Sequence, residues 1–402
     1  MSRRLARRAT RVLWVLGAVG ALLVLVKFFV ADVYRVDSGS MRPTIFGGRA
    51  RPDEPGFTEW VLVLYDDEPE LARFDLAVMR SREGSAPLVK RVTGLPGETI
   101  GIADGDLWIE GKRLPSAVPR PAPIVVFDER WLDVPKFFHF ESERWREDSG
   151  EWVVAGADES PGSLMSYHPD LRDDYLDREH QRVPGLRQVN DGILELEFRL
   201  DADGGDGKLR FRLVEEGDTF EVVLESRRIA LVRHSARTLL EKHEESGSVI
   251  TEVPVSLETG RWYQLSFANV DNHLTLAVPE LQLAIGHDYP TNEPHPGHSS
   301  GAERSIGSRV AFGAEACTAR FRSVRILRDP YYTAVGTFGV EAPLALGPDE
   351  YFLLGDNSAS STDSRHFGPV HAHELLGRPV AIVWPDVRRL EGGRPTSSGP
   401  SE

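Results

Sequence analysis

Residues 88–97 read Leu-Val-Lys-Arg-Val-Thr-Gly-Leu-Pro-Gly and place a lysine inside an apolar run. The β-rich composition of Pro87–Val92 predicts a strand, and Gly94–Gly97 predicts the turn that follows it. Burial among apolar neighbours would disfavour the charged amine of Lys90 and lower its pKa from about 10.4 to roughly 8. We therefore expect Lys90 to serve as a base.

Two other segments carry hydroxyl and charged groups in short patterns. Residues 38–44 read Ser-Gly-Ser-Met-Arg-Pro-Thr, and residues 355–365 read Gly-Asp-Asn-Ser-Ala-Ser-Ser-Thr-Asp-Ser-Arg. A serine hydroxyl is a weak nucleophile until a base takes its proton. The three segments contain no histidine, and no Gly-x-Ser-x-Gly motif surrounds Ser40. Lys90 is the base that remains, so the sequence predicts a serine–lysine dyad, a variant of the catalytic triad.

Taken together, and in their order along the chain, the three segments resemble the signature motifs of the type I signal peptidases, or leader peptidases. The resemblance covers residues 12–115 and 335–387. It implies that Ser40 is the nucleophile and Lys90 the general base. It also implies that Ser38 and the backbone N–H of Ser40 stabilise the oxyanion, and that Ser361 orients the lysine.

The same resemblance assigns supporting and substrate-binding roles. Asp356, Asp363 and Arg365 correspond to the acidic and basic residues that support the site. Met41 and Val89 adjoin the dyad and correspond to positions that line shallow apolar pockets. Such pockets hold only small side chains, so the implied substrate is a signal peptide that ends in a small-x-small motif.

The sequence departs from the family pattern in four places. Asp37 stands where a proline is usual, Phe74 replaces the glycine of Arg-Gly-Asp, and Glu98 replaces an aspartate. Asn357-Ser358-Ala359 stands in place of Asn-Arg-Asp. These changes concern substrate specificity more than the dyad.

The N-terminus has the pattern of a membrane anchor. Five arginines lie within residues 1–11, and an apolar run follows over residues 12–30, interrupted by Lys27. A helix over this run would be about 28 Å long, close to the thickness of the hydrocarbon core. The positive flank predicts a cytoplasmic N-terminus and a catalytic domain on the outer side of the cell membrane. The residues that follow form a poor cleavage site, so we expect a retained anchor rather than a cleaved signal peptide.

Composition changes at residues 115–123, which contain four prolines. We expect a catalytic domain whose first part is 31–123 and whose second part is 334–390. The segment 124–333 is then an inserted domain, and the polar tail 391–402 is predicted to be disordered.

The second half of the insert is rich in strands of alternating polarity, which predicts a jelly-roll-like β-sandwich. Asp201–Gly207 resembles a calcium loop but lacks the distal glutamate, so we interpret it as a hairpin turn between strands 193–200 and 209–214. Gly260–Tyr263 and the strands after it resemble concanavalin-like or laminin-G-like domains. This resemblance implies a carbohydrate or protein ligand.

Composition excludes several classes. The formal charge is −15, from 47 basic and 62 acidic residues, which argues against a nucleic-acid partner. The one cysteine, Cys317, excludes an intramolecular disulfide and a cysteine-rich zinc module. No metal or cofactor is implied.

The sequence thus predicts a mainly β protein with an N-terminal transmembrane helix and a signal-peptidase-type β domain that is split by a β-sandwich. The predicted function is removal of signal peptides from exported precursors at the bilayer. The alternative is a membrane-tethered, catalytically silent protein that binds through its lectin-like insert.

Overall fold

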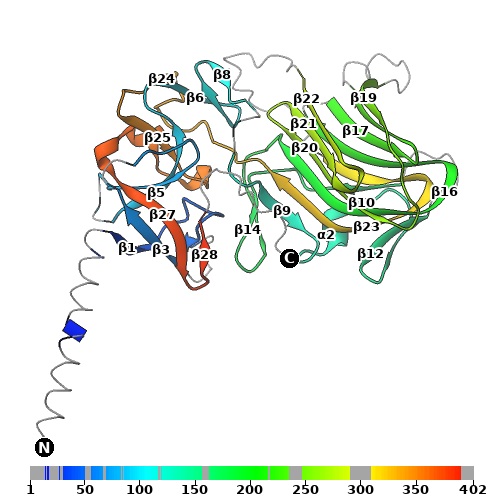
Figure 1. The fold of residues 1–402 in the computed structure, drawn as a ribbon, viewed down its shortest axis with the longest axis horizontal. Coiled ribbons are helices and arrows are strands. Elements are labelled where there is room, and N and C mark those ends of the chain that lie inside the picture. Colours follow the sequence, from blue (N-terminus) through cyan, green and yellow to red (C-terminus); the bar gives the residue numbers. More distant parts are fainter. Residues whose placement is uncertain are drawn as a thin grey trace, which may run out of the picture. The chain divides into compact units, whose positions relative to one another are not determined.

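The computed structural model describes residues 14, 16–17, 27, 30–49, 56–66, 69–82, 84, 86–115, 118, 120–155, 163–215, 218–234, 247–289 and 309–390. The chain divides into two compact units (Figure 1). Unit 1 comprises Met1–Ala122 and Tyr332–Glu402, and unit 2 is Pro123–Tyr331. Strands dominate both units, so the predicted β class is confirmed.

The larger sheet of unit 1 has nine strands among the described residues. Its order is β1-β3-β27-β4-β5-β25-β26, with β2 beside β3 and β28 beside β27. Their bounds are β1 Ala31–Val36, β2 Gly47–Gly48, β3 Phe57–Tyr65, β4 Leu76–Met79, β5 Leu88–Gly94, β25 Glu350–Leu354, β26 Val370–His371, β27 Leu375–Trp384 and β28 Arg388–Arg389.

A smaller sheet and short helical turns complete unit 1. The smaller sheet has the order β24-β6-β7-β8. The bounds are β6 Thr99–Ala103, β7 Asp106–Ile109, β8 Lys112–Arg113, β24 Leu344–Ala345, η2 Ser358–Ser360, α4 Ser364–Phe367 and η3 Ala372–Glu374.

Strand β5 is an interior strand of the larger sheet, with a neighbouring strand on each edge. It pairs with β4 on one side and with β25 on the other, antiparallel in both cases. Its residues from Lys90 to Gly94 are all buried, as expected of a central strand. The first part of unit 1 contributes β4 and β5, and the part after the insert contributes β25. The sheet therefore joins segments that unit 2 separates in sequence.

Unit 2 is built from β9 to β23. Its thirteen-stranded sheet contains β9 Ile124–Asp128, β10 Phe138–Phe140, β11 Trp145–Asp148, β12 Glu151–Ala155, β13 Leu164–Tyr167, β16 Gly192–Glu215, β17 Asp218–Glu225, β18 Arg228–His234, β19 Ser248–Pro254, β20 Trp262–Val270, β21 His273–Val278, β22 Leu283–Asp288 and β23 Arg309–Arg328, as far as these residues are described. Outside it lie α2 Val134–Phe137, η1 Pro279–Leu281 and the pair β14 Tyr175–Leu176 and β15 Arg182–Val183.

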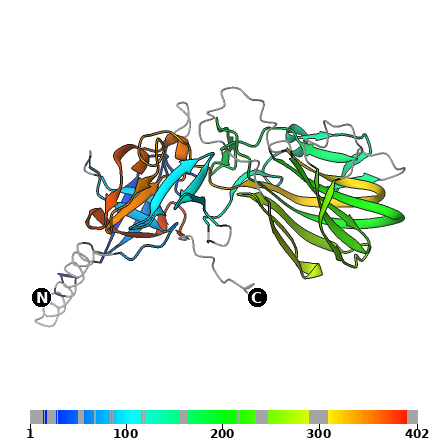
Figure 2. The same cartoon turned by 90° about the horizontal axis from the view of Figure 1, so that it is seen from above.

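Two long antiparallel strands, β16 and β23, run side by side along unit 2 (Figure 2, green beside yellow). The first half of β16 also pairs with β20 and its second half with β17. Apolar residues from both halves, among them Phe198 and Phe211, belong to the same buried core. The predicted inserted β domain is therefore present.

The predicted hairpin turn at Asp201–Gly207 is wrong. The segments 193–200 and 209–214 belong to one continuous strand, β16, and the glycine-rich stretch lies within it. The register with β23 shifts between Leu200 and Ala202 and again between Asp203 and Lys208. Such irregularities bend a strand without ending it. The glycines thus mark a bend rather than a turn.

The predicted anchor, residues 12–30, and the predicted tail, 391–402, lie outside the described residues except for Trp14, Leu16, Gly17, Lys27 and Val30. Among the residues that are described, no helix has the length and apolar character needed to cross a bilayer.

Candidate active site

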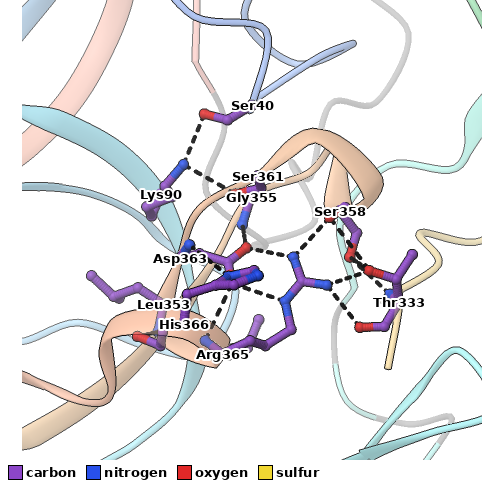
Figure 3. A network of polar contacts seen from close by, with 12 residues as sticks. Ser40, Lys90, Thr333, Leu353, Gly355, Ser358, Ser361, Asp363, Arg365 and His366 are labelled. Carbon is purple, nitrogen blue, oxygen red and sulfur yellow. Dashed lines mark hydrogen bonds and ion pairs between the residues drawn. The ribbon is translucent and has the colours of Figure 1, made fainter. Parts of the chain in front are cut away.

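Lys90, Ser40 and Ser361 meet in a buried cluster (Figure 3). The Lys90 Nζ donates hydrogen bonds to Ser40 Oγ at 2.8 Å and to Ser361 Oγ at 3.1 Å. Only 2% of Lys90 and 7% of Ser40 is exposed to solvent. The structure therefore brings together three residues that lie in three separate sequence segments.

Burial lowers the pKa of Lys90 from 10.5 to about 8. The main cause is desolvation, since a buried site disfavours the ammonium ion. The carboxylates of Asp363 and Asp356 act in the opposite direction, and the guanidinium of Arg365 acts in the same direction as burial. Near pH 8 a substantial fraction of Lys90 is thus a neutral amine that can accept a proton.

Ser40 lies in the turn that connects β1 to β2. Its carbonyl oxygen accepts a hydrogen bond from the backbone N–H of Asn357 at 3.0 Å. The Asn357 side chain also donates to the carbonyl of Gly39 at 3.0 Å. Ser38 Oγ lies 3.3 Å from Ser40 Oγ. The segment after β25 therefore holds the serine turn in place against Lys90.

Gly355 is required by this close approach. A Cβ at this position would lie 2.2 Å from Ser361 Oγ and 2.5 Å from the carbonyl oxygen of Ser40. Any side chain here would separate the serine turn from the lysine. The backbone N–H of Gly355 also donates to Asp363 Oδ2 at 3.0 Å, which links the glycine to the buried carboxylate.

Asp363 and Arg365 form an ion pair from which solvent is fully excluded. Arg365 Nε and Nη2 donate to the two carboxylate oxygens at 2.8 and 2.7 Å, and both side chains are 0% exposed. The remaining guanidinium donors contact the carbonyls of Thr333 at 2.7 Å and Ser358 at 2.8 Å, and the Thr333 hydroxyl. Thr333 is the second residue of unit 1 after unit 2 ends, so the chain is hydrogen-bonded to this pair where it returns to unit 1.

Arg91, the residue after Lys90 in β5, forms a second buried ion pair, with Asp356. Arg91 donates to both oxygens of Asp356 at 2.7 and 2.6 Å, and its third nitrogen donates to the carbonyl of Phe74 at 2.7 Å. The hydroxyl of Thr44 also donates to Asp356. Asp356 thereby ties the serine turn to β5.

The two predicted substrate-pocket residues belong to the apolar core beside the dyad. Met41 is 1% exposed and lies in the same cluster as Ile45 and Val78. Val89, next to Lys90, is partly buried against that cluster. Their role toward a substrate remains a prediction.

Three of the departures from the family pattern are accommodated locally. Asp37 is exposed and its carboxylate accepts from Arg35 at 2.9 Å. Glu98 accepts from the backbone N–H of Leu95 at 2.7 Å, and so closes the turn after β5. Phe74 adopts a left-handed backbone, with φ of 70°, yet its ring is 1% exposed. Burial of the ring offsets the strain that a glycine would avoid.

Sequence reasoning missed Arg91, Asn357 and Thr333. Arg91 had a signal, because a charged residue inside a predicted central strand requires a buried partner. Asn357 and Thr333 had none, since their contacts, made through backbone groups, an amide and a hydroxyl, join irregular segments. Ser358 was noted only as a departure, whereas its hydroxyl accepts from the Thr333 N–H at 2.8 Å.

A family model described as signal peptidase, peptidase S26, matches residues 8–129 and 324–384. Signal peptidase I P of Bacillus subtilis subsp. natto is 32% identical over 102 residues, which is 25% of this chain and 51% of that protein. Signal peptidase I of Streptococcus pneumoniae is 33% identical over 92 residues, or 23% of this chain and 39% of that protein. The chain thus spans about half the length of the first of these relatives and less of the second.

The solved structures that resemble the chain are β proteins of very different sequence. A carbohydrate binding module of Bacillus subtilis, CBM66, has 12% identity and a TM-score of 0.30, with coverage of 47% of this chain and 94% of that one. This likeness is too remote to identify a ligand. The family match lies mainly on the two segments that flank unit 2, and over these segments the chain resembles the signal peptidases of peptidase family S26.

Proposed function

We propose that the chain is a membrane-bound serine endopeptidase that removes signal peptides from exported precursors with a Ser40–Lys90 dyad. The observation that carries the proposal is the 2.8 Å hydrogen bond between Lys90 Nζ and Ser40 Oγ in a site where the pKa of the amine is lowered to about 8. A general base works best when its pKa lies near the working pH.

In the proposed reaction, the neutral Lys90 amine takes the proton of the Ser40 hydroxyl while Oγ attacks the scissile carbonyl carbon. The Ser40 N–H and the Ser38 hydroxyl donate to the oxyanion that forms. Lys90 then gives its proton to the leaving amine, and the peptide bond breaks. The acyl-enzyme is hydrolysed by a water molecule that loses its proton to Lys90, which restores the Ser40 hydroxyl.

The other site residues act on position. Ser361 accepts from Lys90 and fixes the direction of its amine, while Asp363 and Arg365 hold the segment that carries Ser361. Asp356 ties this segment to β5 through Arg91. Met41 and Val89 line the shallow pockets that accept the two small side chains of a small-x-small motif in the substrate.

An exposed apolar surface supports contact with a bilayer. Val33, Trp60 and Trp384 are 38%, 40% and 60% exposed, and with Val383 they line a shallow hollow on β1, β3 and β27. Strand β1 begins directly after the predicted anchor. Tryptophan favours the boundary between lipid and water. We propose that this hollow rests on the outer surface of the cell membrane, and that Trp60→Ser with Trp384→Ser weakens binding of an anchor-deleted chain to phospholipid vesicles.

The test of the dyad is cleavage of a precursor with an Ala-x-Ala site in detergent micelles between pH 6 and 10. Activity should rise through about pH 8 as Lys90 becomes neutral. Ser40→Ala and Lys90→Met should each abolish cleavage. Ser360→Ala and Lys112→Met, which replace exposed residues of the same types, should retain it. Absence of cleavage by the intact chain would favour the alternative, a silent protein that binds through unit 2.

A further inference from the structure

Two histidines and two carboxylates meet at the end of β25 that is remote from Gly355. Asp349 immediately precedes β25, His371 ends β26, and His373 lies in η3. One side-chain ligand atom from each of these three residues lies within 4.8 Å of the other two. None of them contributes to the contacts that hold Ser40 and Lys90.

The backbone around this cluster is fixed by its own hydrogen bonds. Glu350 pairs with His371 across the β25–β26 ladder. The N–H of Ala372, between the two histidines, donates to the carbonyl of Asp349 at 2.8 Å. The N–H of His371 donates to the Glu374 carboxylate at 2.9 Å. The two segments therefore present their side chains from a defined framework rather than from free loops.

The side chains have the arrangement that a metal ligand set requires. His371 Nδ1 lies 3.1 Å from Asp349 Oδ2, and the rings of His371 and His373 are nearly parallel with centroids 5.4 Å apart. The other ring nitrogen of His371, Nε2, lies 3.7 Å from Glu350 Oε1. Glu350 is itself oriented, because its second oxygen accepts from the Gly347 N–H at 2.7 Å. Metal-binding histidines usually direct their second nitrogen at a carboxylate in this way.

We infer that Asp349, His371 and His373 form a binding site for a divalent transition-metal ion of the zinc type, with Glu350 orienting His371. Two imidazoles and one carboxylate suit zinc, nickel or copper better than magnesium or calcium, which prefer oxygen ligands. Asp349 and His373 are exposed, so small side-chain movements can bring the three atoms to bonding distance. Water would complete the coordination, as in other open zinc sites.

A bound ion would join η3 to the start of β25. Strand β25 leads at its C-terminal end into Gly355 and Asp356, which contact the serine turn. The ion would cross-link the chain at the other, N-terminal end of this strand. The consequence is stabilisation of unit 1 rather than a step in peptide hydrolysis. This inference is independent of the proposed protease activity.

The test is zinc titration of the full-length chain, prepared without a histidine tag and stripped with a chelator. Calorimetry should show one saturable site of micromolar affinity, and the melting temperature should rise with zinc but not with magnesium. His373→Gln and Asp349→Asn should each weaken binding at least about tenfold, as loss of a ligand does, and Glu350→Gln should weaken it by about tenfold. His139→Gln, which replaces an exposed histidine of β10, should leave binding unchanged.

Circular dichroism of each variant without metal checks that the fold is retained. Zinc affinity that is the same in His373→Gln and Asp349→Asn as in the unsubstituted chain would overturn the inference, since the ion would then bind elsewhere. Absence of saturable binding would overturn it too, and would leave the cluster as a set of surface ion pairs.

Discussion

The charged pairs at the candidate site of unit 1 differ in exposure from a charged pair on the long strands of unit 2. In unit 1 the Arg365–Asp363 and Arg91–Asp356 side chains are at most 5% exposed. In unit 2 the pair Arg325–Glu195, which joins β23 to β16, is about one-third exposed. Buried pairs cost desolvation and fix a geometry, whereas exposed pairs contribute little to stability. The difference indicates that the buried ion pairs of unit 1 fix the geometry of the candidate site, whereas the pair on β16 and β23 lies on the solvent-exposed face of a sheet.

The largest effect should come from breaking the buried pair of unit 1. Arg365→Met leaves the Asp363 carboxylate without its partner in a site closed to water, and should lower the free energy of unfolding by about 3–5 kcal/mol. Urea unfolding followed by tryptophan fluorescence measures this loss. Arg365→Met combined with Asp363→Leu should recover part of it, because no unpaired charge then remains. A double variant less stable than Arg365→Met would contradict this account.

Lys90→Met should abolish cleavage and yet stabilise the protein. The folded state holds the pKa of Lys90 at about 8, below its ordinary value of 10.5, so the unfolded chain binds this proton more tightly. The resulting cost is complete below about pH 8 and disappears as the pH rises toward 10.5. At pH 7 the variant should gain up to about 3 kcal/mol, less whatever the lost hydrogen bonds contribute.

Denaturant unfolding of both proteins at pH 7 and pH 10 measures this gain. The advantage of Lys90→Met should shrink at the higher pH. If the difference in stability between the variant and the unsubstituted chain did not shift against the variant from pH 7 to pH 10, burial would not be the source of the lowered pKa.

Thr333→Val should have an intermediate effect. It removes a hydroxyl that contacts the Arg365 guanidinium and lies 3.2 Å from Ser358 Oγ in a buried region. Leaving such polar groups unsatisfied costs about 1–3 kcal/mol. We expect a lower kcat with little change in KM, because Thr333 acts through Arg365 and not on the substrate. Thr333→Ser should restore both kcat and stability, and failure of this rescue would argue against a role for the hydroxyl.

The smallest effect should come from the solvent-exposed ion pair between β16 and β23 in unit 2. Glu195→Gln removes the charge that pairs with Arg325 at 2.8 Å. Because both side chains contact solvent, the change in unfolding free energy should be within about 1 kcal/mol and should shrink further at high salt. A loss as large as that of Arg365→Met would remove the contrast between the two units.

The sequence motifs predicted which residues meet at the site better than they predicted the residues that hold those residues in position. Ser40, Lys90 and Ser361 could be expected to meet because each stands in a recognisable segment. Their catalytic roles remain predictions that the cleavage assay addresses. Thr333 and Asn357 could not be expected, since the bonds that involve their backbone groups depend on how irregular segments cross after folding.

The fold of unit 2 shows why local signals fail in long strands. Aspartate and glycine favour turns, and the stretch from Asp201 to Gly207 contains little else. Pairing with β23 on both sides of this stretch overrides the local preference, and register shifts absorb the irregularity. A pattern read over a few residues cannot reveal a partner strand more than 100 positions away.

The ends of unit 2 meet: Ile124 of β9 pairs with Arg328 of β23. Lys90 and Ser361, which are 271 positions apart, must nevertheless find each other for the site to form. A folded unit 2 shortens this loop about fourfold, which lowers the entropic cost of closing it by roughly 1 kcal/mol. Prior folding of the insert thus favours assembly of the candidate site, and a lesion deep in unit 2 can reduce the yield of assembled sites without altering Ser40 or Lys90.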